Sequence, residues 1–88
     1  MTEQDLHVFI CNEFLDGDLE FPIDPDTRLV EEGICDSLGL VRIVAQIEAR
    51  HPGIRIQDQE VTRDNLGSIS QIVGFVQSKL HTGVVAEA

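Results

Sequence analysis

The sequence has no tryptophan, no tyrosine and only four phenylalanines among its 88 residues. Its hydrophobic fraction of 42% therefore comes mainly from isoleucine, valine, leucine and alanine. Aliphatic side chains of this kind suit packed helices, and a chain of this length can bury one modest core but not two. Nothing in the sequence supports a large enclosed active site.

Basic residues are also scarce. Six lysines and arginines stand against 16 aspartates and glutamates, which gives a net charge of −10. Binding to nucleic acid or to an anionic membrane depends on basic side chains, so we expect neither. Residues 1–36 hold 11 acidic residues against Arg28 alone, whereas residues 37–88 hold five of each sign. An acidic recognition surface must therefore lie mainly in the first half of the chain.

Cysteines and long apolar runs are few. Cys11 and Cys35 lack the spacing of a zinc knuckle, and no apolar run matches a signal peptide or spans a bilayer. We therefore expect a cytoplasmic protein with free thiols, while the sequence leaves a disulfide between the two cysteines open. No metal site is expected, because His7 and Cys11 are only two ligands and the acidic loop lacks the glycine and the last glutamate of an EF-hand.

The first part of the chain predicts one helix and a long loop. Thr2 and Asp5 have the spacing of a capping box at a helix start. Four apolar residues behind them share one helical face: Leu6, Phe9, Ile10 and Phe14. A glycine and two prolines then interrupt any helix around the acidic residues 16–26. Three apolar residues are expected to pin the end of this loop to the core: Leu29, Val30 and Ile34.

The second part predicts two longer helices with a short one between them. We expect a helix to begin at Ser37, a residue type favoured at N-caps, and to end before Pro52. Four of its residues are expected to face the core: Leu40, Val41, Val44 and Ile47. A short helix is expected near residues 59–63, and Ser68 with Gln71 forms a capping box before the last helix.

These segments predict an all-α protein. The expected fold is a small four-helix bundle of three longer helices and one short helix, with a long first loop. Residues 1–81 form the expected domain, and residues 82–88 are expected to form a flexible C-terminal tail. We expect the protein to be a monomer.

The candidate functional residues lie where the first loop ends and the second long helix begins. They form the run Gly33-Ile34-Cys35-Asp36-Ser37-Leu38. At about 100° per residue, four residues fall opposite the core face of this helix: Leu38, Arg42, Ala45 and Ala49. Core packing does not explain an exposed leucine beside a serine. Because a helix N-terminus favours an anion, Ser37 suits phosphorylation or phosphopantetheinylation better than attack on a substrate.

Asp36-Ser37-Leu38 and the residues around it resemble the attachment site and second helix of acyl and peptidyl carrier proteins of the stand-alone type. A glycine lies three residues before Asp36, and the apolar pattern continues along the helix through Val41, Ile43, Val44, Ile47 and then Glu48. The resemblance extends over residues 3–80. It implies that a Mg²⁺-dependent transferase moves 4′-phosphopantetheine from coenzyme A to Ser37, and that Asp36 helps the transferase to engage the site.

The same resemblance implies a carrier and not an enzyme, which holds cargo as a thioester and presents it to partner enzymes. The expected partners are the phosphopantetheinyl transferase, an acyl- or aminoacyl-loading ligase and downstream biosynthetic enzymes. The expected partner-recognition residues are Leu38, Arg42, Ala45 and Glu48. Gly39 and Arg42 stand where carriers of fatty acid synthesis are often acidic, which points to a specialised pathway and leaves the cargo open.

Three other interpretations of the site stay open. An ordinary N-cap would explain Ser37, but not the exposed Leu38 or the preceding Asp36. A serine hydrolase would need one of three histidines as base, His7, His51 or His81, and the Gly-x-Ser-x-Gly motif is absent. A non-catalytic helical adaptor would bind a partner helix through the face of Leu38, Ala45 and Ala49.

Overall fold

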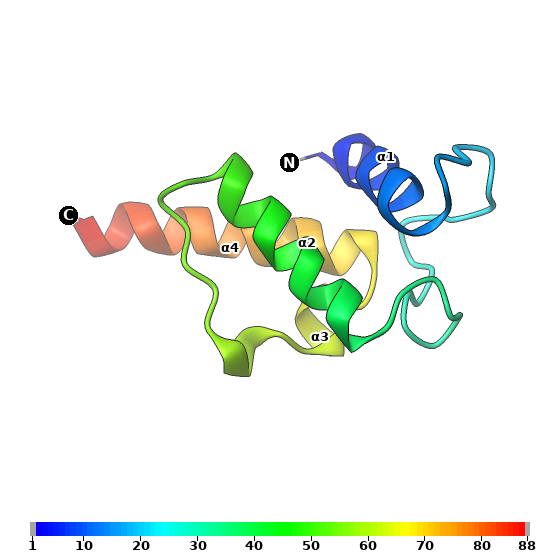
Figure 1. Cartoon of the computed structure of the whole chain (residues 1–88). Helices are drawn as coiled ribbons and strands as arrows, with labels where there is room; N and C mark the ends of the chain where they lie inside the picture. Colours follow the sequence, from blue (N-terminus) through cyan, green and yellow to red (C-terminus); the bar gives the residue numbers. More distant parts are fainter. Residues whose placement is uncertain (1, 88) are drawn as a thin grey trace.

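The computed structural model describes residues 2–87, with side chains described for residues 2–80. Within this range lie four α-helices and one 3₁₀ helix, and no strand: α1 (Glu3–Phe14), α2 (Ser37–Arg50), η1 (Asp58–Glu60), α3 (Arg63–Leu66) and α4 (Ile69–Glu87). Three of the helices are long and one is short, and a long loop joins α1 to α2 (Figure 1). The predicted all-α bundle is confirmed. None of these helices, over residues 2–87, is long and apolar enough to cross a membrane.

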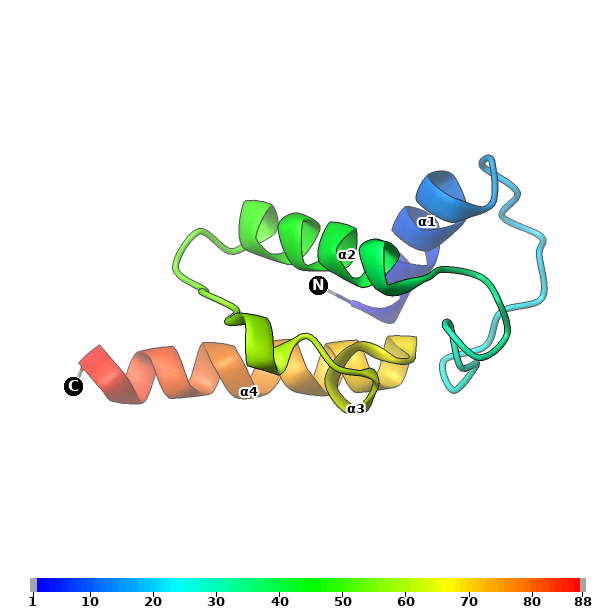
Figure 2. The same cartoon turned by 60° about the horizontal axis from the view of Figure 1, so that its bottom comes forward.

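Helix α4 continues to Glu87, past the position where the sequence suggested the end of the domain. Its C-terminal end extends beyond the other helices (Figures 1 and 2). The side chains of residues 81–87 and the whole of residue 88 lie outside the described residues. The flexible tail expected for residues 82–88 therefore stays a prediction.

Helix α1 begins with the predicted capping box. The Thr2 N–H donates to Asp5 Oδ2 and the Asp5 N–H donates to Thr2 Oγ1, both at 3.1 Å. Leu6 and Ile10 are fully buried, and the rings of Phe9 and Phe14 meet edge to face with centroids 6.4 Å apart. The four apolar residues identified in the sequence thus join the core side of α1.

The core face of α2 differs in one respect from the prediction. Leu40, Ile43 and Ile47 are buried, whereas Val41 is 53% exposed, so its assignment to the core was wrong. The buried face is centred on Ile43 and Ile47, and Val41 lies about 60° around the helix from Leu38 on the outer side. The sequence pattern predicted the helix correctly, but the observed buried face is rotated by part of a turn from the predicted one.

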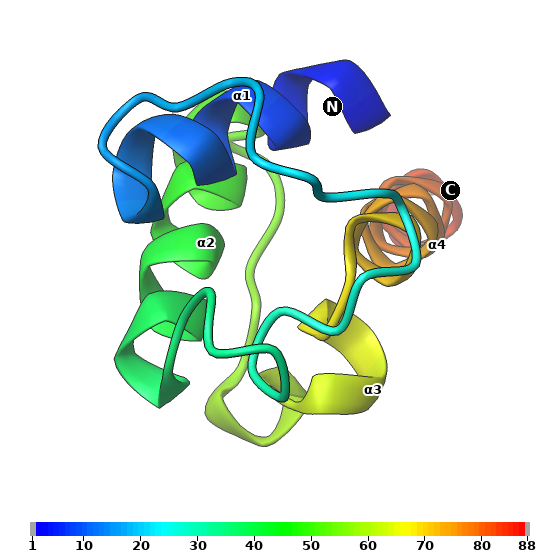
Figure 3. The same ribbon diagram turned by 90° about the vertical axis from the view of Figure 1, so that its right-hand side faces the viewer.

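The long first loop is anchored at the start of α4. The Ser70 N–H donates to the Pro25 carbonyl at 2.9 Å, and the Leu29 N–H donates to the Gly67 carbonyl at 2.8 Å. Leu29 is fully buried, as predicted for the residues that pin the loop. Figure 3 shows the loop crossing from α1 to the start of α4 and returning to the start of α2. Contacts far along the chain thus fix where α2 begins.

The short helix expected near residues 59–63 is divided into η1 and α3. Thr62 starts a new helix between them, because its Oγ1 accepts a hydrogen bond from the Asn65 N–H at 3.2 Å. The next cap is also present, since the Gln71 N–H donates to Ser68 Oγ at 3.2 Å.

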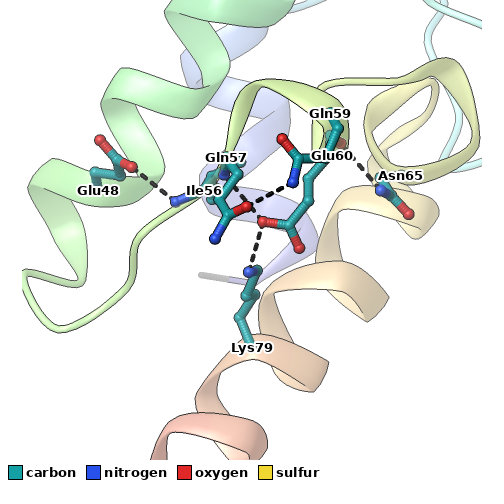
Figure 4. Close-up of polar contacts among 7 residues, drawn as sticks. All are labelled: Glu48, Ile56, Gln57, Gln59, Glu60, Asn65 and Lys79. Atoms are coloured by element: carbon teal, nitrogen blue, oxygen red, sulfur yellow. Dashed lines mark hydrogen bonds and ion pairs between the residues drawn. The ribbon is translucent and has the colours of Figure 1, made fainter.

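Two carboxylates fasten the segment between α2 and α3 to the long helices (Figure 4). The Ile56 N–H donates to Glu48 Oε2 on α2 at 2.9 Å. Lys79 on α4 lies 2.7 Å from Glu60 Oε1, and the Asn65 side-chain amide donates to the Glu60 carbonyl at 2.9 Å. Hydrogen bonds from the Gln57 N–H and from Lys79 hold the pKa of Glu60 below its usual value.

Gly39 and Gly74 offer a matched test of helix packing. A Cβ on Gly39 would lie 2.6 Å from the Cys35 Cβ and 3.1 Å from the Phe14 ring, whereas a Cβ on Gly74 would meet nothing within 4 Å. We expect Gly39→Ala to lower the free energy of unfolding by about 1–3 kcal/mol through overpacking. Gly74→Ala should raise it by about 0.5–1 kcal/mol, because alanine loses less backbone entropy. Urea denaturation checks both values, and equal stabilities would contradict the close approach of α2 to Cys35.

Candidate functional site

Ser37 is the first residue of α2, and Asp36 is its N-cap. The backbone of Asp36 is extended, with φ −109° and ψ −169°, and its Oδ1 accepts a hydrogen bond from the Gly39 N–H at 2.9 Å. The interpretation of Ser37 as an ordinary N-cap is therefore wrong, because the neighbouring aspartate does that work. Ser37 itself is exposed.

The loop before Ser37 is held by its own backbone. Gly33 has a φ of +77°, a conformation that side chains disfavour, and its N–H donates to the Val30 carbonyl at 3.0 Å. The Leu29 carbonyl accepts from the N–H groups of Ile34 at 2.9 Å and Cys35 at 3.1 Å. Ile34 and Cys35 are both 9% exposed. The exposed serine thus follows a firmly packed turn.

The outer face of α2 beyond Ser37 is partly apolar. Leu38 is 72% exposed, as the sequence predicted, and Val41 adds a second exposed apolar side chain that the sequence analysis placed in the core. Arg42, Ala45 and Ala49 are also exposed, as predicted. Val41 lies four residues after Ser37 and therefore one turn along the same side of the helix. The sequence pattern did not show how α2 is rotated against the core, so Val41 was missed as part of the exposed face.

Two of the expected recognition residues have partners within the chain. Arg42 Nη1 lies 3.4 Å from Glu13 Oε1 at the end of α1, and both side chains are exposed, so this ion pair adds little stability. Glu48 is half-buried, and its carboxylate accepts the hydrogen bond from the Ile56 N–H. Arg42 lies one turn after Leu38 on the helix surface. Glu48 also holds the following segment in place.

Among residues 2–80, the cysteines and histidines do not build a catalytic centre around Ser37. Cys11 and Cys35 are free, and burial raises the pKa of both thiols. His51 follows the last residue of α2, about 20 Å along the helix from Ser37. His7 lines a different pocket, beside Leu19 and Ile69, and its Nε2 lies 3.4 Å from the Leu19 carbonyl. The side chain of His81 lies outside the described residues.

The arrangement suits an anionic group on Ser37. An exposed hydroxyl at the first helical position needs no cavity, because a substituent on it extends outward. The start of α2 carries the positive end of the helix dipole, which favours a phosphodiester there. These residues fit covalent attachment of phosphopantetheine, which supplies a thiol at the end of a long arm. Among the side chains described, those of residues 2–80, no three histidines, cysteines, aspartates or glutamates form a group that would hold a metal ion.

Comparison with known proteins agrees with this geometry. Residues 12–76 match the family model described as a phosphopantetheine attachment site. The chain is 32% identical over 79 residues to the D-alanyl carrier proteins of two Lactococcus lactis subsp. cremoris strains, MG1363 and SK11, covering 90% of this chain and 95% of each relative. It also resembles a chain of a solved structure described as that of an FAD-dependent dehydrogenase, with a TM-score of 0.66 and 28% identity, covering 80% of this chain and 96% of that one.

The family match and the relatives together favour a carrier over a helical adaptor and over an enzyme. Carriers of this family are modified by phosphopantetheinyl transferases, receive cargo from ligases and perform no catalysis themselves. The match spans most of the chain and includes the start of α2, where the exposed serine lies. The chain therefore belongs to the phosphopantetheine-binding carrier protein family, as a stand-alone carrier that holds its cargo on a 4′-phosphopantetheine arm.

Proposed function

We propose that Ser37 is the residue that carries the phosphopantetheine arm. The observation that supports this most directly is its place at the first position of α2, exposed, with the capping role taken by Asp36. Its hydroxyl oxygen attacks the coenzyme A phosphorus that carries the pantetheine and forms a phosphodiester. The bond from that phosphorus to the oxygen of the nucleotide phosphate breaks, adenosine 3′,5′-bisphosphate leaves, and the hydroxyl proton passes to a base of the transferase or to water. The packed turn before Asp36 presents that oxygen in a defined position.

Asp36 has two roles in this proposal. Its side chain fixes the first turn of α2 through the Gly39 N–H, and its negative charge lies directly beside the reacting serine. Leu38, Arg42, Ala45 and Glu48 form the surface that partner enzymes read around it. The exposed apolar and basic groups of that face give partners a surface that differs from the acidic first half of the chain.

The cargo we propose is an amino acid. This rests on the 32% identity to D-alanyl carrier proteins over nearly the whole of both chains. Gly39 and Arg42 agree with it, because a second helix without strong acidity departs from the carriers of fatty acid synthesis. An ATP-dependent ligase would load the amino acid as a thioester, for use in a specialised biosynthetic pathway.

A second candidate partner is a flavin enzyme. The resemblance to a chain of a structure described as an FAD-dependent dehydrogenase supports it, since that chain is as short as this one: 80% of this chain spans 96% of it. In this case the enzyme would oxidise the tethered cargo, with FAD accepting the electrons. This role would follow loading and does not compete with it.

We further propose that the protein is a cytoplasmic monomer. Both cysteines are free thiols, which supports a reducing compartment. Each is at least 91% buried, so neither thiol is offered to a second copy for cross-linking.

Replacement of Ser37 tests the attachment site. Incubation with coenzyme A, Mg²⁺ and a broad-specificity phosphopantetheinyl transferase should add one prosthetic group to the wild-type chain and none to Ser37→Ala, because the accepting oxygen is gone. Intact-protein mass spectrometry measures the addition. Ser78→Ala, which removes another exposed serine, should be modified like the wild type. Addition to the Ser37→Ala chain would falsify the assignment.

Two substitutions of Asp36 separate its charge from its cap. Asn is as good an N-cap as Asp, so Asp36→Asn should keep the free energy of unfolding, whereas Asp36→Ala should lose about 1 kcal/mol. If the charge engages the transferase, both variants should be modified more slowly than the wild type. Normal modification of the Asn variant, measured by the rate of mass increase, would reduce Asp36 to a structural cap.

Loading assays test the cargo. A ligase that loads D-alanyl carrier proteins, given ATP and D-alanine, should form a D-alanyl thioester on the phosphopantetheine-bearing chain and should leave a fatty acid unattached. Mass spectrometry before and after thioester cleavage by hydroxylamine measures the cargo. The L. lactis carrier serves as positive control. If that carrier is loaded under conditions in which this chain takes no amino acid, the proposed cargo is wrong while the attachment at Ser37 stands.

A further inference from the structure

The junction of α3 and α4 and the first turn of α4 hold the first loop at three points. The Ser70 N–H donates to the Pro25 carbonyl at 2.9 Å, and the Ser70 hydroxyl donates to Asp26 Oδ1 at 2.9 Å. The Leu29 N–H donates to the carbonyl of Gly67, the C-cap of α3, at 2.8 Å. Asp26 and Ser70 are 44 positions apart in the chain. This part of the loop is therefore fixed by a distant part of the chain as well as by its own turn.

Ser70 contributes the side-chain bond of this set. It is half-buried, and its Oγ lies 2.9 Å from Asp26 Oδ1 and 3.4 Å from Ser68 Oγ, so the carboxylate is the closer partner. A hydrogen bond to an ionised acceptor is stronger than one between neutral groups. Asp26 is itself held in a turn, because its N–H donates to Asp24 Oδ1 at 2.8 Å and the Asp24 N–H donates to Thr27 Oγ1 at 2.9 Å. Those bonds stay within the turn, whereas Ser70 joins the turn to α4.

Leu29 links this anchored part of the loop to the attachment site. Its side chain is fully buried, and its carbonyl accepts from the N–H groups of Ile34 at 2.9 Å and Cys35 at 3.1 Å. Cys35 directly precedes Asp36, whose side chain caps α2 and leaves Ser37 at the first helical position. The position of the Ser37 hydroxyl therefore depends on where Leu29 is held.

Ser70 lies apart from the proposed recognition surface. That surface is on α2 and consists of Leu38, Arg42, Ala45 and Glu48, whereas Ser70 is in α4. Figures 2 and 3 show α2 and α4 on different sides of the molecule, with the first loop joining them at one end. An effect of Ser70 on the reaction at Ser37 therefore passes through the loop and not through contact with an enzyme bound to α2.

The reaction at Ser37 depends on the position of one oxygen. In the proposed step the hydroxyl oxygen attacks a phosphorus atom of coenzyme A as the bond to the nucleotide phosphate breaks, so the attacking and leaving oxygens must lie roughly in line. An error of about 1 Å in the placement of a reacting group can lower a rate about 100-fold. A loop that can shift should therefore lower the rate of transfer more than the affinity for the transferase.

We propose that Ser70 is a positioning residue for the phosphopantetheinylation of Ser37, and that it clamps residues 25–29 of the first loop to α4 through Asp26. This inference rests on the proposed attachment at Ser37. Ser70 acts through Asp26 and Leu29 and not on the reacting atoms. Two main-chain hydrogen bonds still hold this part of the loop when the hydroxyl is absent, so its removal should slow the transfer a few-fold and not abolish it.

Removing the Ser70 hydroxyl tests the proposal. With a broad-specificity transferase, coenzyme A and Mg²⁺, we expect kcat for Ser70→Ala to fall about threefold or more while the KM for the carrier stays within about twofold of the wild type. Ser70→Thr keeps the hydroxyl and should restore kcat. Ser78→Ala is the matched control, because Ser78 is an exposed serine of the same helix, and it should keep both constants. A folded Ser70→Ala chain with a wild-type kcat, or with a raised KM alone, would overturn the proposal.

Variants of Asp26 test whether the two residues act as a pair. Asp26→Ala removes the acceptor and should lower kcat as much as Ser70→Ala does, and the double variant should show no further loss, because one bond is involved. Asp26→Asn keeps an acceptor oxygen without the charge and should retain a kcat near that of the wild type. Losses that multiply in the double variant, or an Asn variant as slow as the Ala variant, would contradict the shared clamp.

Amide hydrogen exchange tests the route through the loop without the transferase. In Ser70→Ala, the N–H groups of Ile34 and Cys35, which bond to the Leu29 carbonyl, should exchange faster than in the wild type, whereas amides in the middle of α1 should not change. Unchanged exchange at Ile34 and Cys35 would rule out the loop as the route. Failure of the attachment proposal looks different, because the wild-type chain would then take no group at Ser37 while these two amides would still respond to Ser70→Ala.

Discussion

The hydrogen bond from the Gly39 N–H to the Asp36 side chain decides what the rest of the site can do. By capping α2, Asp36 leaves Ser37 at the first helical position, where its hydroxyl is exposed and is not used to start the helix. Gly39 also fixes the start of α2 by packing, because the absence of its side chain lets the helix approach Cys35 and Phe14 closely. The start of α2 is thus fixed by the hydrogen bond to Asp36 and by close packing of Gly39 against Cys35 and Phe14.

Much of this could be predicted from the sequence because the signals are local. The caps at Thr2 and Ser68, the long acidic loop and the exposed Leu38 all depend on residues within a few positions of each other. The cap of α2 was misassigned because Asp and Ser are both good N-caps and stand side by side. Only the backbone geometry, extended at Asp36 and helical from Ser37, separates the two.

Other features depended on contacts that no sequence pattern shows. Val41 is exposed because of how α2 is rotated against the core. The full burial of Ile43 and Ile47 determines that rotation. The division between η1 and α3, and the role of Glu48 as acceptor for the Ile56 N–H, depend on where that segment crosses α2. The anchoring of the first loop depends on the hydrogen bond between the Leu29 N–H and the Gly67 carbonyl, two residues 38 positions apart in the chain.

The ion pairs of this chain differ in a way that suits a carrier. Lys79 and Glu60 are 2.7 Å apart with side chains 23% and 28% exposed, and together with Glu48 they hold the segment that has little helix of its own. Arg42 and Glu13 are 3.4 Å apart with side chains 61% and 38% exposed, and an exposed pair of this kind contributes only about 0–1 kcal/mol. At the proposed recognition surface a partner could therefore separate Arg42 from Glu13 at little cost, whereas the tighter Lys79–Glu60 pair joins η1 to α4 elsewhere. In the proposed function several enzymes bind this surface in turn, and a weakly paired Arg42 would let each of them rearrange the surface without unfolding the carrier.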